Sequence, residues 1–78
     1  MYARSFRRAA DTRRFIITDA GALGWKVREE QNSRVVREVC YDDWHRVERA
    51  RMNIALTGRE LANAGWTEVQ GPPYSTKR

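Results

Sequence analysis

The feature that most constrains the fold is a change in the spacing of apolar residues at residues 42–43. Before this point, aromatic and β-branched residues occur in short, partly alternating runs, a pattern typical of strands. After it, apolar residues fall on one side of a helical wheel, namely Trp44, Val47, Ile54 and Leu61. A chain that changes period once in this way predicts an α+β fold, in which one helix covers one face of an antiparallel sheet.

Three stretches before this change have the composition of strands. Residues 14–18 are aromatic and β-branched, residues 25–30 alternate, and residues 34–41 carry apolar residues on both faces. The polar residues 31–33 suit a hairpin loop. We therefore expect a three-stranded antiparallel meander over these stretches, to which residues 66–70 can add a short C-terminal strand.

The long helix is predicted over residues 43–64. Asp43 is a good N-cap, because its carboxylate accepts hydrogen bonds from the free amides of the first turn. At the other end, Gly65 is expected in the left-handed conformation that ends a helix. Trp66 would then pack on Leu61, as in a Schellman motif.

Length and charge limit the domain organisation. The chain has 78 residues, which suffices for one domain, and a formal net charge of +5. Residues 1–14 hold five arginines and one aspartate, a net of +4, and residues 66–78 add +1, so the middle of the chain is neutral. We therefore expect a mobile basic arm at residues 1–13, a folded domain at 14–70 and a flexible tail at 71–78.

Composition argues against membrane and secretory classes. No apolar run approaches the roughly 18 residues that span a bilayer, and residues 1–8 have positive charge without the apolar segment of a secretory signal. The single cysteine, Cys40, excludes an internal disulfide framework. We expect a cytoplasmic protein without membrane contact, whose small core favours a partner subunit.

Arginines interleaved with aromatic residues suggest nucleic-acid binding as the first function hypothesis. Arginine forks suit phosphates and rings suit bases. Most of these arginines lie in the expected arm, and the cations beside Trp25 would extend the surface, although Trp25 itself fits the core better. An arm of this kind can also serve solubility alone. The residues expected to contact DNA or RNA are Arg4, Arg7, Arg8, Arg13, Arg14, Lys26 and Arg28.

The outer side of the predicted helix supports a second hypothesis. Met52 and Leu56 lie one turn apart and point away from the apolar side of the helix. One helix covers only one face of a sheet, and Ile16 with residues 34–41 leaves apolar side chains on the other face. We therefore expect a second copy to add a layer and form a homodimer. The same outer stripe can instead dock another protein, as an interaction module or inhibitor; it consists of His45, Arg49, Met52 and Leu56.

A third hypothesis rests on residues 56–65. This stretch resembles the first helix and turn of bacterial helix-turn-helix regulators, and Thr57 with Glu60 fits a capping box. The resemblance implies DNA binding through a second helix, for which only residues 66–71 are available before the Gly-Pro-Pro break. The apolar spacing across Gly58 favours one continuous helix instead.

Nothing in the sequence indicates catalysis. Cys40 and His45 are the only residues of their kinds, and we interpret them as a small core thiol and a solvated histidine rather than a nucleophilic pair. One cysteine and one histidine cannot complete a structural zinc site. Residues 21–24 lack the spacing of a phosphate-binding loop. We therefore expect no enzymatic activity, no metal and no cofactor.

Overall fold

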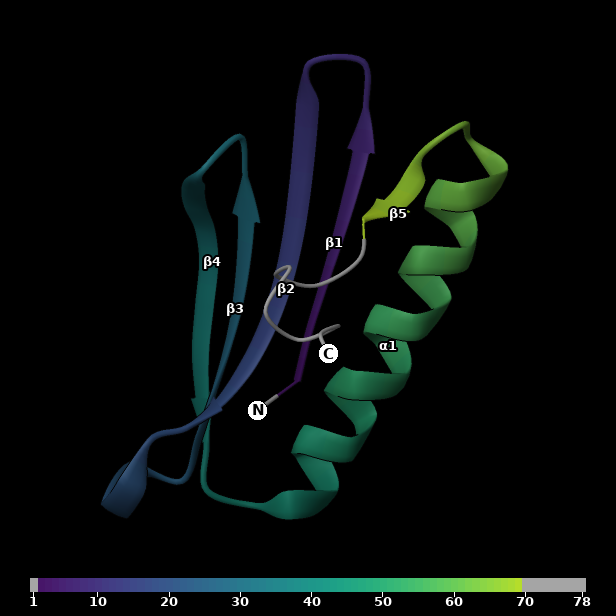
Figure 1. Ribbon diagram of the computed structural model, residues 1–78. Coiled ribbons are helices and arrows are strands. Elements are labelled where there is room, and N and C mark those ends of the chain that lie inside the picture. The colour runs from purple at the N-terminus through teal and green to yellow at the C-terminus, as the bar shows by residue number, and fades with distance from the viewer. Residues whose placement is uncertain (1, 70–78) are drawn as a thin grey trace, which may run out of the picture.

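The computed structural model describes residues 2–69 as one antiparallel sheet and one long helix. In chain order the elements are β1 (Tyr2–Arg8), β2 (Asp11–Asp19), the 3-10 turn η1 (Gly21–Leu23), β3 (Trp25–Gln31), β4 (Arg34–Tyr41), α1 (Trp44–Asn63) and β5 (Thr67–Val69). The strand order in the sheet is β4-β3-β2-β1-β5. Helix α1 starts near the end of β4 and runs along one face of the sheet toward β5, and the other face carries no helix (Figure 1).

The α+β class is confirmed, but the prediction of a three-stranded sheet is wrong, because the sheet has five strands. Residues 2–8, expected in a mobile arm, form β1, which pairs with β2 on one side and β5 on the other. The expected C-terminal strand is present as β5. The expected tail at residues 71–78 lies outside the described residues. Residues 11–13 of the expected arm belong to β2, so all the charged side chains that give residues 1–14 their net +4 lie in the sheet.

The sequence concealed β1 for two physical reasons. Its helix-facing positions alternate between rings and arginines, so that Arg4 and Arg8 interrupt the apolar pattern set by Tyr2 and Phe6. The turn to β2 also lacks the glycine, asparagine or proline that marks most tight turns. Ala9 takes the positive φ of 54° instead. The residue types of β1 and its turn therefore show neither a regular apolar pattern nor a typical turn residue.

The core lies between α1 and the middle strands, and Gly58 allows the two layers to approach closely. A Cβ at Gly58 would lie 2.8 Å from Cζ of Phe6, whose side chain is fully buried. The Phe6 ring meets Phe15 edge-on at 6.0 Å between centroids. The buried core residues are Phe6, Phe15, Ile17, Val47, Ile54 and Leu61.

Trp44 departs from its predicted place in this core. It is 46% exposed and packs on Trp25, with 5.1 Å between ring centroids, at the start of α1. Its position at the first residue of the helix explains the difference, because no preceding turn of the helix lies beside the ring. Trp25 itself packs against the core, as expected.

The predicted end of the helix is confirmed in detail. Gly65 has φ +94°, the left-handed conformation. The Trp66 amide donates to the Leu61 carbonyl at 2.9 Å, and the Gly65 amide donates to the Ala62 carbonyl at 3.2 Å. These two bonds are the pair that defines a Schellman motif. They turn the chain sharply, so that β5 returns to the edge of β1.

The helix-turn-helix arrangement is absent from residues 2–69. Helix α1 runs without interruption from its N-cap Asp43, whose carboxylate accepts from the His45 amide at 2.9 Å, to Asn63. Residues 67–69, which a recognition helix would need, form β5. Within the same range, no helix is long and apolar enough to cross a membrane.

Candidate nucleic-acid interface

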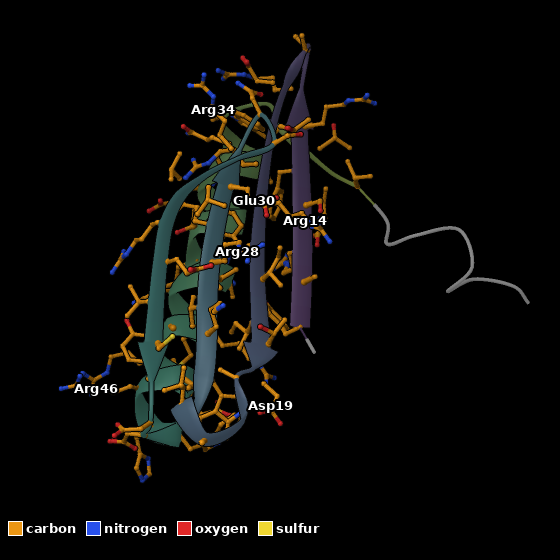
Figure 2. All side chains as sticks on the ribbon, turned by 90° about the vertical axis from the view of Figure 1, so that its left-hand side faces the viewer. Arg14, Asp19, Arg28, Glu30, Arg34 and Arg46 are labelled. Carbon is orange, nitrogen blue, oxygen red and sulfur yellow. The ribbon has the colours of Figure 1, made fainter. Side chains whose placement is uncertain are left out.

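The candidate interface is the face of the sheet opposite α1, which we call the helix-free face. Successive residues of a strand point to opposite faces, so the buried Phe6, Phe15 and Ile17 define the helix side and their neighbours define the other. Figure 2 views this face and shows Arg14, Arg28 and Glu30 close together on it. The strand residues whose register places them there include Ser5, Arg7, Thr12, Arg14, Ile16, Thr18, Lys26, Arg28, Glu30, Glu38 and Cys40.

The structure divides the seven predicted nucleic-acid contacts between the two faces. One group shares the helix-free face and consists of Arg7, Arg14, Lys26 and Arg28. The other group lies on the helix side and consists of Arg4, Arg8 and Arg13. Sequence reasoning could not separate these groups, because strand register decides on which face each residue lies.

Two of the helix-side arginines form ion pairs that hold strands together. The Arg4 guanidinium donates to both carboxylate oxygens of Glu68 on β5, at 2.8 and 2.7 Å. This pairing lowers the pKa of Glu68 below its usual range and raises that of Arg4. Arg13 on β2 donates to Glu29 on β3 at 2.7 Å. These guanidinium groups are therefore engaged within the fold.

Arg8 is engaged as well, although without a carboxylate. Its guanidinium lies over the Trp66 ring, 5.1 Å from the centroid, and donates to the Ala64 carbonyl at 3.1 Å. A cation near the last carbonyls of a helix is favourable for the helix dipole. Arg8 therefore connects the end of β1 to the end of α1.

The helix-free group forms a diagonal line, which we call the cation row: Arg7, Arg14, Arg28 and Lys26. Arg7 pairs with Thr12, two residues before Arg14, which places Arg7 and Arg14 diagonally on adjacent strands. Arg14 pairs with Glu30, and Arg28 comes two residues before Glu30 on β3. Diagonal neighbours of this kind lie about 7–8 Å apart. Lys26 continues the row along β3.

The charges of the cation row are only partly compensated. Arg28 donates to Glu38 at 2.9 Å and to Glu30 at 3.4 Å, and these contacts raise its pKa. No ion pair within residues 2–69 involves the other three cations of the row. With four cations against the two glutamates, the row and its partners carry a net charge of +2.

The aromatic half of the predicted pattern lies elsewhere. Tyr2, Trp25 and Tyr41 pack against the core with the two phenylalanines, on the helix side of the sheet. The strand residues of the helix-free face between residues 2 and 69 include no aromatic ring. This face therefore offers charge and hydrogen-bond donors to a ligand, but no surface on which bases can stack.

For two residues of the helix-free face, the exposure differs from the one that the sequence suggested. Ile16 is 8% exposed, so it is buried without the second layer that we expected from another copy. Its cross-strand neighbours are Ala3 and Arg28, and long arginine side chains commonly cover apolar residues with their stems. Cys40, interpreted as a core thiol, is exposed beside Lys26, because β4 is an edge strand.

Three members of the predicted outer stripe, His45, Met52 and Leu56, lie on the solvent side of α1, whereas Arg49 lies at the flank that faces β3 and β4. Met52 and Leu56 are 65% and 54% exposed, and His45 and Arg49 are exposed too. His45 and Cys40 thus belong to different layers of the molecule. Residues 2–69 include no group of three or more His, Cys, Asp or Glu side chains that could hold a metal ion.

Comparisons with known protein families, with curated proteins and with solved structures give no match.

Proposed function

We propose that this protein is a small nucleic-acid-binding module that contacts phosphates through the cation row. The observation that supports this is the diagonal alignment of four cations from three adjacent strands on a face that no helix covers. The cations that would bind phosphate lie on paired strands rather than in a mobile arm. The proposed interface retains four of the seven residues that the sequence suggested.

A polymer of phosphates suits this surface better than a single small anion. The diagonal steps of about 7–8 Å separate the cations too widely for one phosphate to bind all of them. A backbone that crosses the three strands can engage them in turn, and each contact releases condensed counterions. Because no ring is present to stack on bases, contacts to the backbone dominate. We therefore expect weak sequence preference.

Removing two cations of the row should reduce both affinity and its salt dependence. For the variant Arg7→Gln/Arg14→Gln, the slope of log K against log salt should fall by about 1.4 on single-stranded DNA, since each lost phosphate contact removes about 0.7. Fluorescence anisotropy titrations with a labelled oligonucleotide at several salt concentrations measure this slope.

The matched control is Arg34→Gln/Arg59→Gln, which changes the net charge equally. Arg34 begins β4 at the hairpin from β3, and Arg59 is exposed on α1, so neither belongs to the cation row. We expect its slope to remain at the wild-type value. If both variants lose the same slope, binding depends on net charge alone, and the cation row is not the interface.

A second candidate function, self-association, is favoured by the exposure of Met52 and Leu56 one turn apart on α1. We propose that this outer stripe pairs with the same stripe of a second copy, since two apolar side chains would leave water together. Sedimentation should then give a dimer for the wild type and a monomer for Leu56→Glu. A wild type that sediments as a monomer would refute this proposal.

A further inference from the structure

The helix side of the molecule contains a cleft of about 370 Å³ between α1 and strands β3 and β4. Its floor is apolar and comes from three strands and the helix, through Phe15, Val27, Val39 and Ile54. Phe15 and Ile54 are also members of the core, whereas the two valines are half-buried. The volume lies within the range of about 300–1,000 Å³ found for small-molecule sites.

Short side chains explain why the cleft stays open. The flank of α1 that faces β3 and β4 presents Ala50, Asn53 and Thr57, none of which is long enough to fill the space above the valines. On the opposite flank the helix meets the sheet closely through Gly58 and Phe6. The helix is thus held against β1 while a gap remains over β3 and β4.

Four arginines line this cleft. Arg28 is paired with Glu38 and Glu30, whereas Arg37, Arg46 and Arg49 are not neutralised by a described residue. Arg37 comes from β4, and Arg46 and Arg49 come from successive turns of α1. The ion pairs within residues 2–69 include none of the three. The carboxylate that lines the cleft belongs to Glu29, which is held by Arg13 at 2.7 Å. Figure 2 shows Arg46 extending beyond the edge strand β4.

An apolar floor with cationic side chains at its margin selects ligands that combine two properties. A purely apolar ligand would leave the guanidinium groups without a partner, and a small inorganic anion would leave the floor exposed. A carboxylate on an alkyl chain satisfies both, because guanidinium and carboxylate match in geometry and the chain removes apolar surface from water.

We infer that this cleft is a second binding site, for an alkyl carboxylate. The carboxylate binds at the arginine margin formed by Arg37, Arg46 and Arg49. The chain lies on the floor along Val27 and Val39. Arg28 of the cation row also lines the cleft, but the three arginines that bind the carboxylate lie outside the row, so either proposal can fail without the other.

A titration of the full chain with decanoate and with decanol, followed by the amide signals in NMR spectra, tests this inference. Decanoate should shift signals of residues 37–41 and 46–57 in a saturable manner, below its micelle-forming concentration. Decanol has the same chain without the charge and should bind at least tenfold more weakly. Equal affinity for the two compounds, or decanoate shifts confined to other residues, would overturn the inference.

Variants separate the contributions of charge and chain. Arg37→Gln/Arg46→Gln should weaken decanoate binding about tenfold, equivalent to about 1.4 kcal/mol, whereas Arg34→Gln/Arg59→Gln should leave it unchanged. Ala50→Leu fills the cleft and should abolish decanoate binding, while a well-dispersed spectrum shows that the chain is folded. Undiminished binding by folded Ala50→Leu would contradict the site. The comparison of decanoate with decanol on the wild type decides the case even if a variant fails to fold.

Discussion

Replacing Phe6 by alanine is expected to lower the free energy of unfolding by about 3–5 kcal/mol, the range for a buried phenylalanine. The side chain is 2% exposed, packs edge-on against Phe15 and sits against Gly58. A chain of this size has a total stability of about 4–12 kcal/mol, so much of it is lost. Urea denaturation followed by tryptophan fluorescence measures the loss.

The matched control is Ser5→Ala, one residue away in β1 but on the helix-free face. Ser5 is half-buried, but the change removes only its hydroxyl, so the loss should stay near the value of about 1 kcal/mol that is typical of a point substitution. If residues 1–13 were a mobile arm, Phe6→Ala would be equally mild, and that result would contradict the five-stranded sheet.

The position of β1 inside the sheet affects the design of binding experiments. Deleting residues 1–8 would remove a strand that pairs on both edges, with β2 and with β5. Loss of nucleic-acid binding after such a deletion would then follow from unfolding as easily as from lost contacts. Paired substitutions on the helix-free face avoid this ambiguity.

Replacing Gly24 by alanine should cost about 3–4 kcal/mol, from backbone strain together with steric overlap. Gly24 has φ +94°, and a Cβ there would overlap the Tyr41 carbonyl oxygen and lie 2.8 Å from Cα of Asp42. Both contacts are backbone atoms at the junction of β4 and α1, so they cannot move without shifting the start of the helix. The midpoint of urea denaturation reports the loss.

Gly21 in the preceding 3-10 turn provides the control for this substitution. It has φ +65°, and no atom lies within 4 Å of the position that a Cβ would occupy. Gly21→Ala should therefore cost only the conformational term, about 1 kcal/mol. Equal losses at the two glycines would contradict the close approach of the turn to the β4–α1 junction.

Features governed by neighbours in the sequence were predicted well. The helix, its N-cap at Asp43 and the Schellman end at Gly65 and Trp66 follow from local spacing and from the residues at each end. The hairpin between β3 and β4 is equally local, with positive φ at Asn32 and Ser33. These features need only a few residues, so the sequence contains the full signal.

Features governed by distant partners were predicted poorly. Nothing near Arg4 indicates that Glu68, at the far end of the chain, compensates its charge and allows it to face the helix. The orientation of the cation row likewise depends on the registers of β1, β2 and β3. The cleft was missed because the three short side chains on α1 are ordinary in a helix, and only the placement of α1 on the sheet leaves a gap beside them.

The central claim is that nucleic acid binds on the helix-free face, and Cys40 offers a direct test without any substitution. It is the single cysteine of the chain, is exposed, and pairs with Lys26 of the cation row across β3 and β4. Its rate of alkylation by iodoacetamide can be followed by mass spectrometry with and without a short single-stranded oligonucleotide.

We predict that alkylation of Cys40 becomes several-fold slower at low salt when anisotropy shows the oligonucleotide to be bound. The rate should return to that of the free protein as added salt weakens the phosphate contacts. An unchanged rate in the presence of bound oligonucleotide would place the contact elsewhere. That result, or the absence of binding at low salt, would contradict the account.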